Sequence, residues 1–154
     1  MAEIVKAIDI AAPVEVVFDY VTDPRNALNF MPNFTKFDPI GRPERGLGAK
    51  VEAHGTAFGM QFKTILEIVE FVKNRRFVSR TTEGIKSTST WQFEPLPDGG
   101  TEVTFISEYN LPGRMLGRLF DKIVMEKDIE KNTIQTLVNL KKILENRPNL
   151  RAVK

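Results

Sequence analysis

Cysteine is absent from the 154-residue sequence, and histidine and tryptophan each occur once. Without cysteine, the chain has no disulfide framework, no thiol nucleophile and no thiolate metal site. The single histidine, His54, alternates along a predicted strand with Lys50 and Glu52, which places it on the outer face. One outward histidine supplies neither a Ser–His–Asp arrangement nor a catalytic zinc site, so we expect no bound metal and assign no cofactor and no catalytic residue.

The chain also lacks long apolar runs and an excess of charge of either sign. No segment approaches the ~20 apolar residues of a transmembrane helix, and the opening MAEIVKAIDI does not have the pattern of a signal peptide. The net charge is +2 and basic residues are mixed with acidic ones, which argues against a nucleic-acid partner. These absences predict a cytoplasmic protein. Residues 147–154, which include Arg147, Arg151 and Lys154, are expected to form a solvated basic tail.

Residues 1–146 are expected to form one domain that begins with a strand and two short helices. Ile4, Ile8 and Ile10 indicate the strand. Pro13 suits the first turn of a helix, and the Asp-Pro pair at 23 and 24 suits the start of a second helix that runs to about residue 30.

From residue 34 to residue 110 the apolar period changes from 3.6 to 2. Breaks at GRPERGLG, Gly59, KNRR, EGIK and PDGG divide this segment into about six strands, which is typical of an antiparallel meander. The irregular alternation from Leu66 to Phe71 predicts a bulge. Trp91 and Phe93 share one face of a hairpin with Phe105 and Tyr109 on the facing strand.

The last segment, residues 114–145, contains no strong helix breaker and predicts one long helix. Its apolar stripe consists of Leu116, Leu119, Phe120, Ile123, Ile134, Leu137 and Leu144. A long helix laid across an antiparallel sheet gives an α+β fold.

Three motifs, in this order, resemble the START-like SRPBCC superfamily, which includes polyketide cyclases and the birch-pollen-allergen proteins. They are IDIAAPVEVVFDYVTDPRN, TWQFEPLPDGGTEVTFISEY and LVNLKKILE. The resemblance implies a helix-grip fold: a seven-stranded curved antiparallel sheet around the long C-terminal helix, with two short helices after strand one and an elongated apolar cavity between sheet and helix. Relatives of this kind use the cavity for lipid or quinone carriage, hormone sensing, or polyketide cyclisation, and no universal catalytic residue carries over.

The residues expected to line this cavity are mostly inward apolar side chains of the sheet and the long helix. They are Phe62, Leu66, Phe77, Trp91, Phe93, Phe105, Tyr109, Leu116, Phe120, Ile123 and Glu130. Without the resemblance, such aromatic residues would be assigned to a filled core. Glu130 falls near the middle of the helical stripe, where a carboxylate must be paired, neutral or wet; the alternative to a ligand contact is a pair with Lys127 at a solvated mouth.

The sequence is compatible with three functions. The first is non-catalytic binding or carriage of an apolar small molecule, such as a lipid, quinone or polyketide-like compound. The second is an enzyme of the cyclase or aromatase kind that uses Tyr109, Glu83 or Glu130 as acid or base. The third is an interaction module whose apolar groove holds a partner protein or a hydrophobic tail. A homodimer also stays open, and the identity of the ligand is not specified by the sequence.

Overall fold

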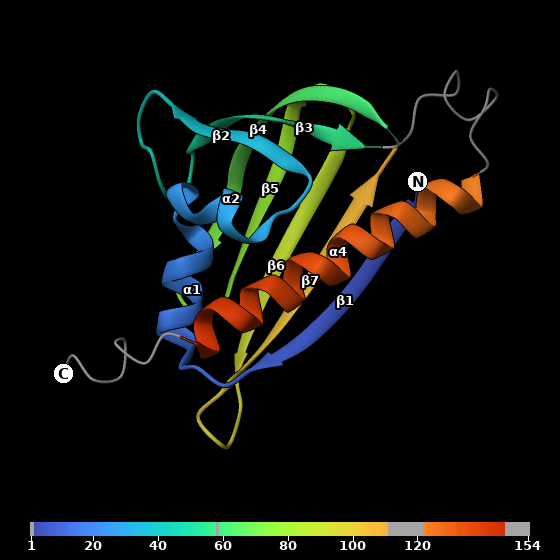
Figure 1. The fold of residues 1–154 in the computed structure, drawn as a ribbon. Helices are drawn as coiled ribbons and strands as arrows, with labels where there is room; N and C mark the ends of the chain where they lie inside the picture. Colours follow the sequence, from blue (N-terminus) through green and yellow to red (C-terminus); the bar gives the residue numbers. More distant parts are fainter. Residues whose placement is uncertain (1, 58, 111–121, 147–154) are drawn as a thin grey trace.

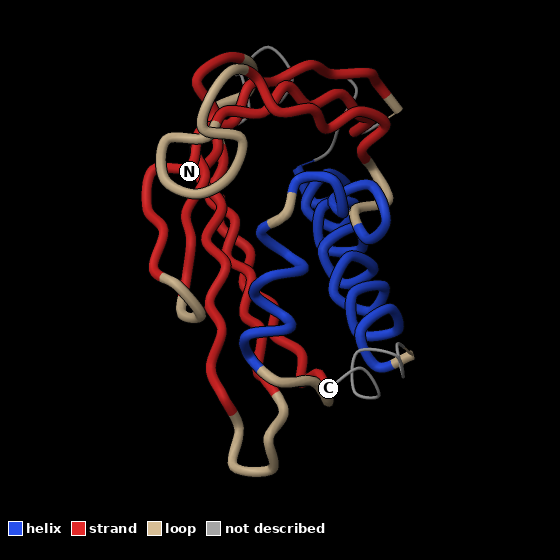
Figure 2. The backbone as a smooth tube through the Cα atoms, turned by 90° about the vertical axis from the view of Figure 1, so that its left-hand side faces the viewer, coloured by secondary structure: helices blue, strands red, loops and turns tan. Residues whose placement is uncertain are grey.

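The computed structural model describes residues 2–57, 59–110 and 122–146, which form one antiparallel sheet with all helices on its concave side (Figures 1 and 2). The strands are β1 (Ala2–Ile10), β2 (Phe34–Ile40), β3 (Lys50–Ala57), β4 (Met60–Val72), β5 (Arg76–Glu83), β6 (Ser87–Pro95) and β7 (Thr101–Tyr109). The helices are α1 (Val14–Thr22), the 3-10 turn η1 (Pro24–Asn26), α2 (Ala27–Phe30) and α4 (Lys122–Glu145). The predicted α+β helix-grip architecture is confirmed.

The seven strands pair in the order β1-β7-β6-β5-β4-β3-β2. Strands β2 to β7 follow one another as the predicted meander, and β1 joins the far side of β7. The register of β4 against β5 shifts between Ile68 and Glu70, which confirms the bulge expected in this segment. In Figure 2 the β2–β4 end of the sheet curls over the helices, so that one face of the sheet is enclosed.

The helices between β1 and β2 begin and end at the expected residues. Pro13 has an extended backbone immediately before α1, where its missing N–H costs no helical hydrogen bond. The Asp23 carboxylate accepts a hydrogen bond from the backbone N–H of Arg25 at 3.0 Å and so caps η1. The second predicted helix is therefore a 3-10 turn that continues into α2 and ends at Phe30.

The long helix is present from residue 122, and the earlier part of the predicted helix lies outside the described residues. Its buried stripe differs from the predicted one: Ile123 is 58% exposed and Ile134 is 43% exposed, whereas Met125 and Leu140 are fully buried. Two threonines, Thr133 and Thr136, complete the inward face. No helix among the described residues combines the length and apolar character needed to cross a membrane.

Helix α4 packs along β1, the first strand of the chain (Figure 1). Lys141 Nζ donates a hydrogen bond to the backbone oxygen of Asp9 at 2.7 Å. Glu145 Oε2 accepts one from the backbone N–H of Ala11 at 2.8 Å. These bonds attach the C-terminal half of α4 to the end of β1.

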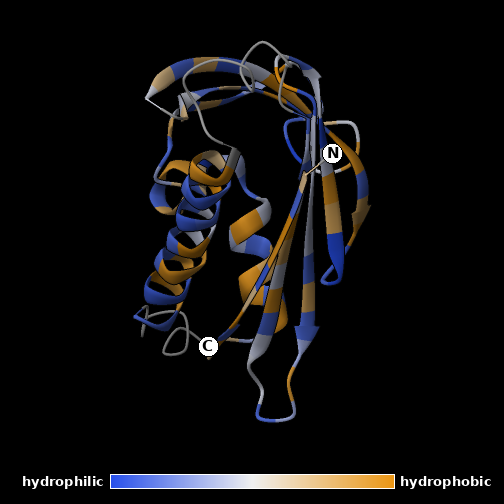
Figure 3. Cartoon of the chain, turned by 90° about the vertical axis from the view of Figure 1, so that its right-hand side faces the viewer, coloured by the Kyte–Doolittle hydropathy of each residue, from blue (hydrophilic) through white to orange (hydrophobic). Residues whose placement is uncertain are grey.

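The hydrophobic core fills the space around α1, at one end of the sheet. Phe18 of α1 lies 5.2 Å from the ring of Phe71 and 5.2 Å from that of Phe93, in edge-on contacts. Figure 3 shows apolar α1 residues between α4 and the sheet. The other end of the concave face is not filled in this way, and it holds the site described below.

The Asp23 carboxylate makes stability depend on pH. It accepts hydrogen bonds from Arg25 Nε at 3.1 Å and Nη2 at 2.8 Å, which, aided by the nearby Arg45, hold the pKa of Asp23 below its usual range. Because the folded pKa is lowered, this contribution is present above about pH 4 and is lost as the pH falls through the folded pKa. Asp23→Asn keeps the capping oxygen, so we expect it to lower the free energy of unfolding at pH 7 by about 1 kcal/mol.

The measurement is urea unfolding of both proteins from pH 3 to pH 7. The difference between wild type and Asp23→Asn should be largest at neutral pH and should shrink below pH 4. A difference that stays constant over this range would contradict the assignment of the effect to the charge of Asp23.

Candidate functional site

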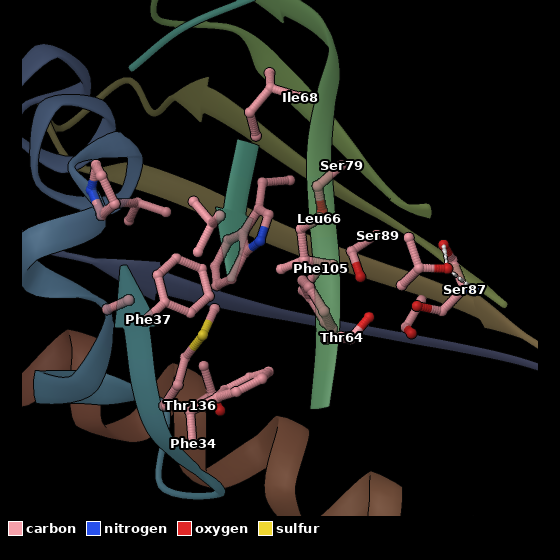
Figure 4. Close-up of a pocket in the computed structure, with 18 of the residues that line it drawn as sticks. Phe34, Phe37, Thr64, Leu66, Ile68, Ser79, Ser87, Ser89, Phe105 and Thr136 are labelled. Atoms are coloured by element: carbon pink, nitrogen blue, oxygen red, sulfur yellow. Dashed lines mark hydrogen bonds between the residues drawn. The ribbon is translucent and has the colours of Figure 1, made fainter. Parts of the chain in front are cut away.

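A cavity of about 300 Å³ lies between the concave face of the sheet and helices α2 and α4. The sheet provides its floor, chiefly from β4 to β7. The opposite wall is formed by Phe34 and Phe37 of β2, Phe30 of α2 and Thr136 of α4. In the close-up of Figure 4, Phe34, Phe37 and Thr136 lie across the cavity from the labelled serines of the floor.

An aromatic row crosses the floor because three residues are directly opposite each other on neighbouring strands. Phe77 of β5 pairs with Trp91 of β6, which pairs with Phe105 of β7. The rings of Phe77 and Trp91 are nearly parallel at 6.1 Å, and those of Trp91 and Phe105 are 4.7 Å apart. Trp91 is only 2% exposed, so it belongs both to the core and to the lining of the cavity.

A row of serines lies beside the aromatic row, two residues further along the strands. Ser79 of β5 pairs with Ser89 of β6, which pairs with Ser107 of β7. All three line the cavity, and Figure 4 shows Ser79 and Ser89 on its floor. Beyond them, Ser87 pairs with Tyr109, and the Thr81 hydroxyl accepts a hydrogen bond from the Ser87 backbone N–H at 3.0 Å. The floor is therefore aromatic at one end and hydroxylated at the other.

Helix α4 faces the floor with a mixed set of side chains that includes Asp128, Ile129, Asn132 and Thr133. The Thr133 hydroxyl donates to the backbone oxygen of Ile129 at 2.8 Å. The Thr136 hydroxyl does the same to Asn132, also at 2.8 Å. Because both threonine hydroxyls are already hydrogen-bonded to the backbone of α4, the threonines can lie on an otherwise apolar face.

Six of the residues predicted to line a cavity are brought together in this lining: Phe62, Leu66, Phe77, Trp91, Phe105 and Tyr109. Two others, Leu116 and Phe120, lie outside the described residues. The remaining three, Phe93, Ile123 and Glu130, are not in the lining, each for a different reason.

Phe93 points to the correct face of the sheet but lies too far toward the core. It is 3% exposed, and the edge-on contact with Phe18 of α1 occupies the space in front of its ring. Strand alternation shows which face of the sheet a side chain lies on, but it does not show which part of that face α1 covers. The sequence therefore could not distinguish Phe93 from Trp91, two residues earlier.

Helical spacing predicts Ile123 and Glu130 on the inward face of α4, but the inward face is the one that contains Met125. Ile123 is largely exposed, as described above. The Glu130 carboxylate forms an ion pair with Lys6 of β1 at 2.8 Å, with both side chains partly exposed. The hydrogen bond from Lys6 lowers the pKa of Glu130. The ion-pair partner is thus Lys6 of the neighbouring strand, which helical spacing could not show, while the charge of Lys127 makes a smaller contribution to lowering the pKa of Glu130.

Tyr109 lines the cavity, and its environment favours the protonated form of its hydroxyl. Burial raises the pKa of Tyr109, and the negative charge of Glu126 raises it further. At neutral pH its hydroxyl can therefore donate a hydrogen bond to a bound molecule but does not act as a base. Glu83, another predicted acid or base, is exposed and is not in the lining.

The only charged side chains among the described residues of the lining are Glu44, Arg45 and Asp128. Arg45 Nη2 donates to Asp19 Oδ1 at 3.0 Å and to the Thr22 hydroxyl at 2.8 Å, which attaches it to α1. His54 lies outside this lining, with its Nε2 2.7 Å from Glu52 on the outer face of β3. Within the part of the chain that the structure describes, no three His, Asp or Glu side chains gather as a metal site would require.

A family model described as polyketide cyclase / dehydrase and lipid transport matches residues 1–145. The comparison with curated proteins gives no match.

Three solved structures illustrate the similarity in fold. A Thermus thermophilus protein is 23% identical, with a TM-score of 0.79 over 92% of this chain and 95% of that chain. The Zhui aromatase/cyclase from Streptomyces sp. R1128 is 16% identical, with a TM-score of 0.78 over 95% and 94%. A START superfamily protein from Mycobacterium smegmatis is 14% identical, with a TM-score of 0.74 over 93% and 97%.

Proposed function

Because this chain belongs to the polyketide cyclase / dehydrase and lipid transport family, a START-like group, we propose that its cavity binds a small, largely apolar molecule. The observation that carries the proposal is the cavity itself, which is bordered by Trp91, Phe105 and Phe34 and is not filled by them. Its volume of about 300 Å³ is at the lower end of the range of small-molecule sites. Mostly apolar lining with a few polar groups is the usual composition of such a site.

Binding is favoured over catalysis by the position of the ionisable groups. Of the three residues considered as acid or base, Glu83 and Glu130 do not border the cavity, and only Tyr109 does. The raised pKa of Tyr109 makes it a hydrogen-bond donor or a weak acid. A cyclase or aromatase activity is the second candidate, with Tyr109 as the group that protonates or polarises a carbonyl oxygen.

The emission of Trp91 provides the test, because this is the only tryptophan in the chain. We expect 4-phenylbutan-1-ol, which does not absorb at the excitation wavelength of tryptophan, to change this emission saturably and to raise the melting temperature. Xylitol has nearly the same number of heavy atoms but is polar throughout, and it should do neither. A response to 4-phenylbutan-1-ol that is linear in concentration, without a change in melting temperature, would contradict the proposal.

A further inference from the structure

The serine row of the cavity floor, Ser79, Ser89 and Ser107, is unusual in its hydrogen bonding. None of the three hydroxyls has a hydrogen-bond partner among the described residues, although Ser79 is only 8% exposed. The threonine hydroxyls of the lining, by contrast, all have partners; Thr64, for example, donates to the backbone oxygen of Glu83 at 2.6 Å. The serine hydroxyls are open to the cavity, and an apolar ligand that covered them would leave them without a partner, which is unfavourable. The row therefore offers three donors and acceptors to whatever occupies the cavity.

The spacing of the row suits one extended ligand. The three residues are direct cross-strand partners, so neighbouring hydroxyls are separated by about one strand spacing of ~4.8 Å. The aromatic row formed by Phe77, Trp91 and Phe105 runs parallel to it, two residues away on the same strands. A ligand whose apolar body lies on the aromatic row would thus present one edge to the serines.

The charges around the cavity exclude an anionic group at this edge. Among the described lining residues, Arg45 is the only cation, and its hydrogen bonds to Asp19 and Thr22 attach it to α1. The carboxylate of Asp128 lies in the opposite wall and repels a second negative charge. A carboxylate on the serine row would be buried without a counter-ion, which is costly.

We propose, on the basis of the binding function above, that Ser79, Ser89 and Ser107 recognise uncharged oxygen groups on one edge of the ligand. The cavity then selects neutral alcohols and ketones over hydrocarbons of the same size, which leave the serines unsatisfied. It also selects them over carboxylates, which cannot be neutralised at this position.

Three probes with the same phenyl-butyl body test this selection: 4-phenylbutan-1-ol, butylbenzene and 4-phenylbutanoate. Their dissociation constants at pH 7 are measured through Trp91 emission and checked by calorimetry. The alcohol should bind at least about tenfold more tightly than the carboxylate. Ser89→Ala should weaken binding of the alcohol by about 3- to 10-fold, corresponding to one hydrogen bond, and leave butylbenzene unchanged or more tightly bound. The triple variant Ser79→Ala, Ser89→Ala, Ser107→Ala should abolish the preference for the alcohol.

Thr90→Ala provides the matched control, since Thr90 follows Ser89 on β6 and is outside the cavity lining. It should leave all three dissociation constants unchanged. If all three probes bind equally well to the wild type and to the triple variant, or if the carboxylate binds most tightly, the inference fails while the binding function stands. If none of the three binds, the binding function itself fails.

Discussion

Replacing Phe93 by alanine is expected to lower the free energy of unfolding by about 3–5 kcal/mol, the largest loss of stability that we predict. Phe93 is 3% exposed and contacts the rings of Phe18 and Phe77 at 5.2 Å and 6.2 Å. Its removal leaves a void between α1 and the sheet that the rigid strands cannot close. Urea unfolding followed by far-UV circular dichroism measures the change.

Phe37→Ala is the matched control for this substitution. Phe37 is only half-buried, and its ring borders a space that is already open. Its loss should cost less than half as much, and Phe93→Ala should leave the dissociation constant of 4-phenylbutan-1-ol unchanged in the folded protein. Equal losses of stability for the two variants would mean that the cavity is as tightly packed as the core.

Replacing Ser107 by phenylalanine is expected to weaken binding of 4-phenylbutan-1-ol by at least tenfold. The side chain of Ser107 faces the cavity, so the new ring occupies the space of the ligand. Because this space is already present, the free energy of unfolding should change by less than about 1 kcal/mol, whereas a ring forced into a filled core costs about 1–3 kcal/mol. Trp91 emission and urea unfolding measure the two quantities.

The control for this experiment is Thr104→Phe on the other face of the same strand. Thr104 is outside the described cavity lining, so binding should be retained. A large loss of stability in Ser107→Phe together with unchanged binding would show that the cavity is not the ligand site.

Most of the fold could be predicted because local signals and the order of elements agree. Pro13 and the Asp-Pro pair at 23 and 24 identify the helix starts, and the change of period at residue 34 identifies the sheet. Antiparallel strands with short connections leave few alternative topologies. Because the strands were identified correctly, their alternation also predicted which residues face the cavity: Phe77, Trp91, Phe105 and Tyr109.

The errors in the predicted site have one physical origin, which is packing between distant segments. Helical spacing alone could not show that Lys6 of β1 lies beside Glu130. Helical spacing also favoured Ile123 over Met125. The stripe that contains Met125 also contains Thr133 and Thr136, so it is less apolar than the stripe that contains Ile123 and Ile134. The signal in the sequence was the residue type, since a threonine hydroxyl can bond within its own helix, as Thr133 and Thr136 do, and so fits an inward face.

The packing of α4 against β1 has a consequence for the way in which the molecule folds. The hydrogen bond between Ala11 and Glu145 joins residues separated by 134 positions, and β1 must also wait for β7 before it can pair. A ribosome releases β1 long before β7 and α4, which it contacts, so the concave face stays uncovered until α4 has been synthesised. Contacts of such long range slow folding, because the entropy of closing the chain opposes them before they form. During this interval the aromatic floor formed by Phe77, Trp91 and Phe105 is exposed to solvent, and it is enclosed only when α4 packs across it.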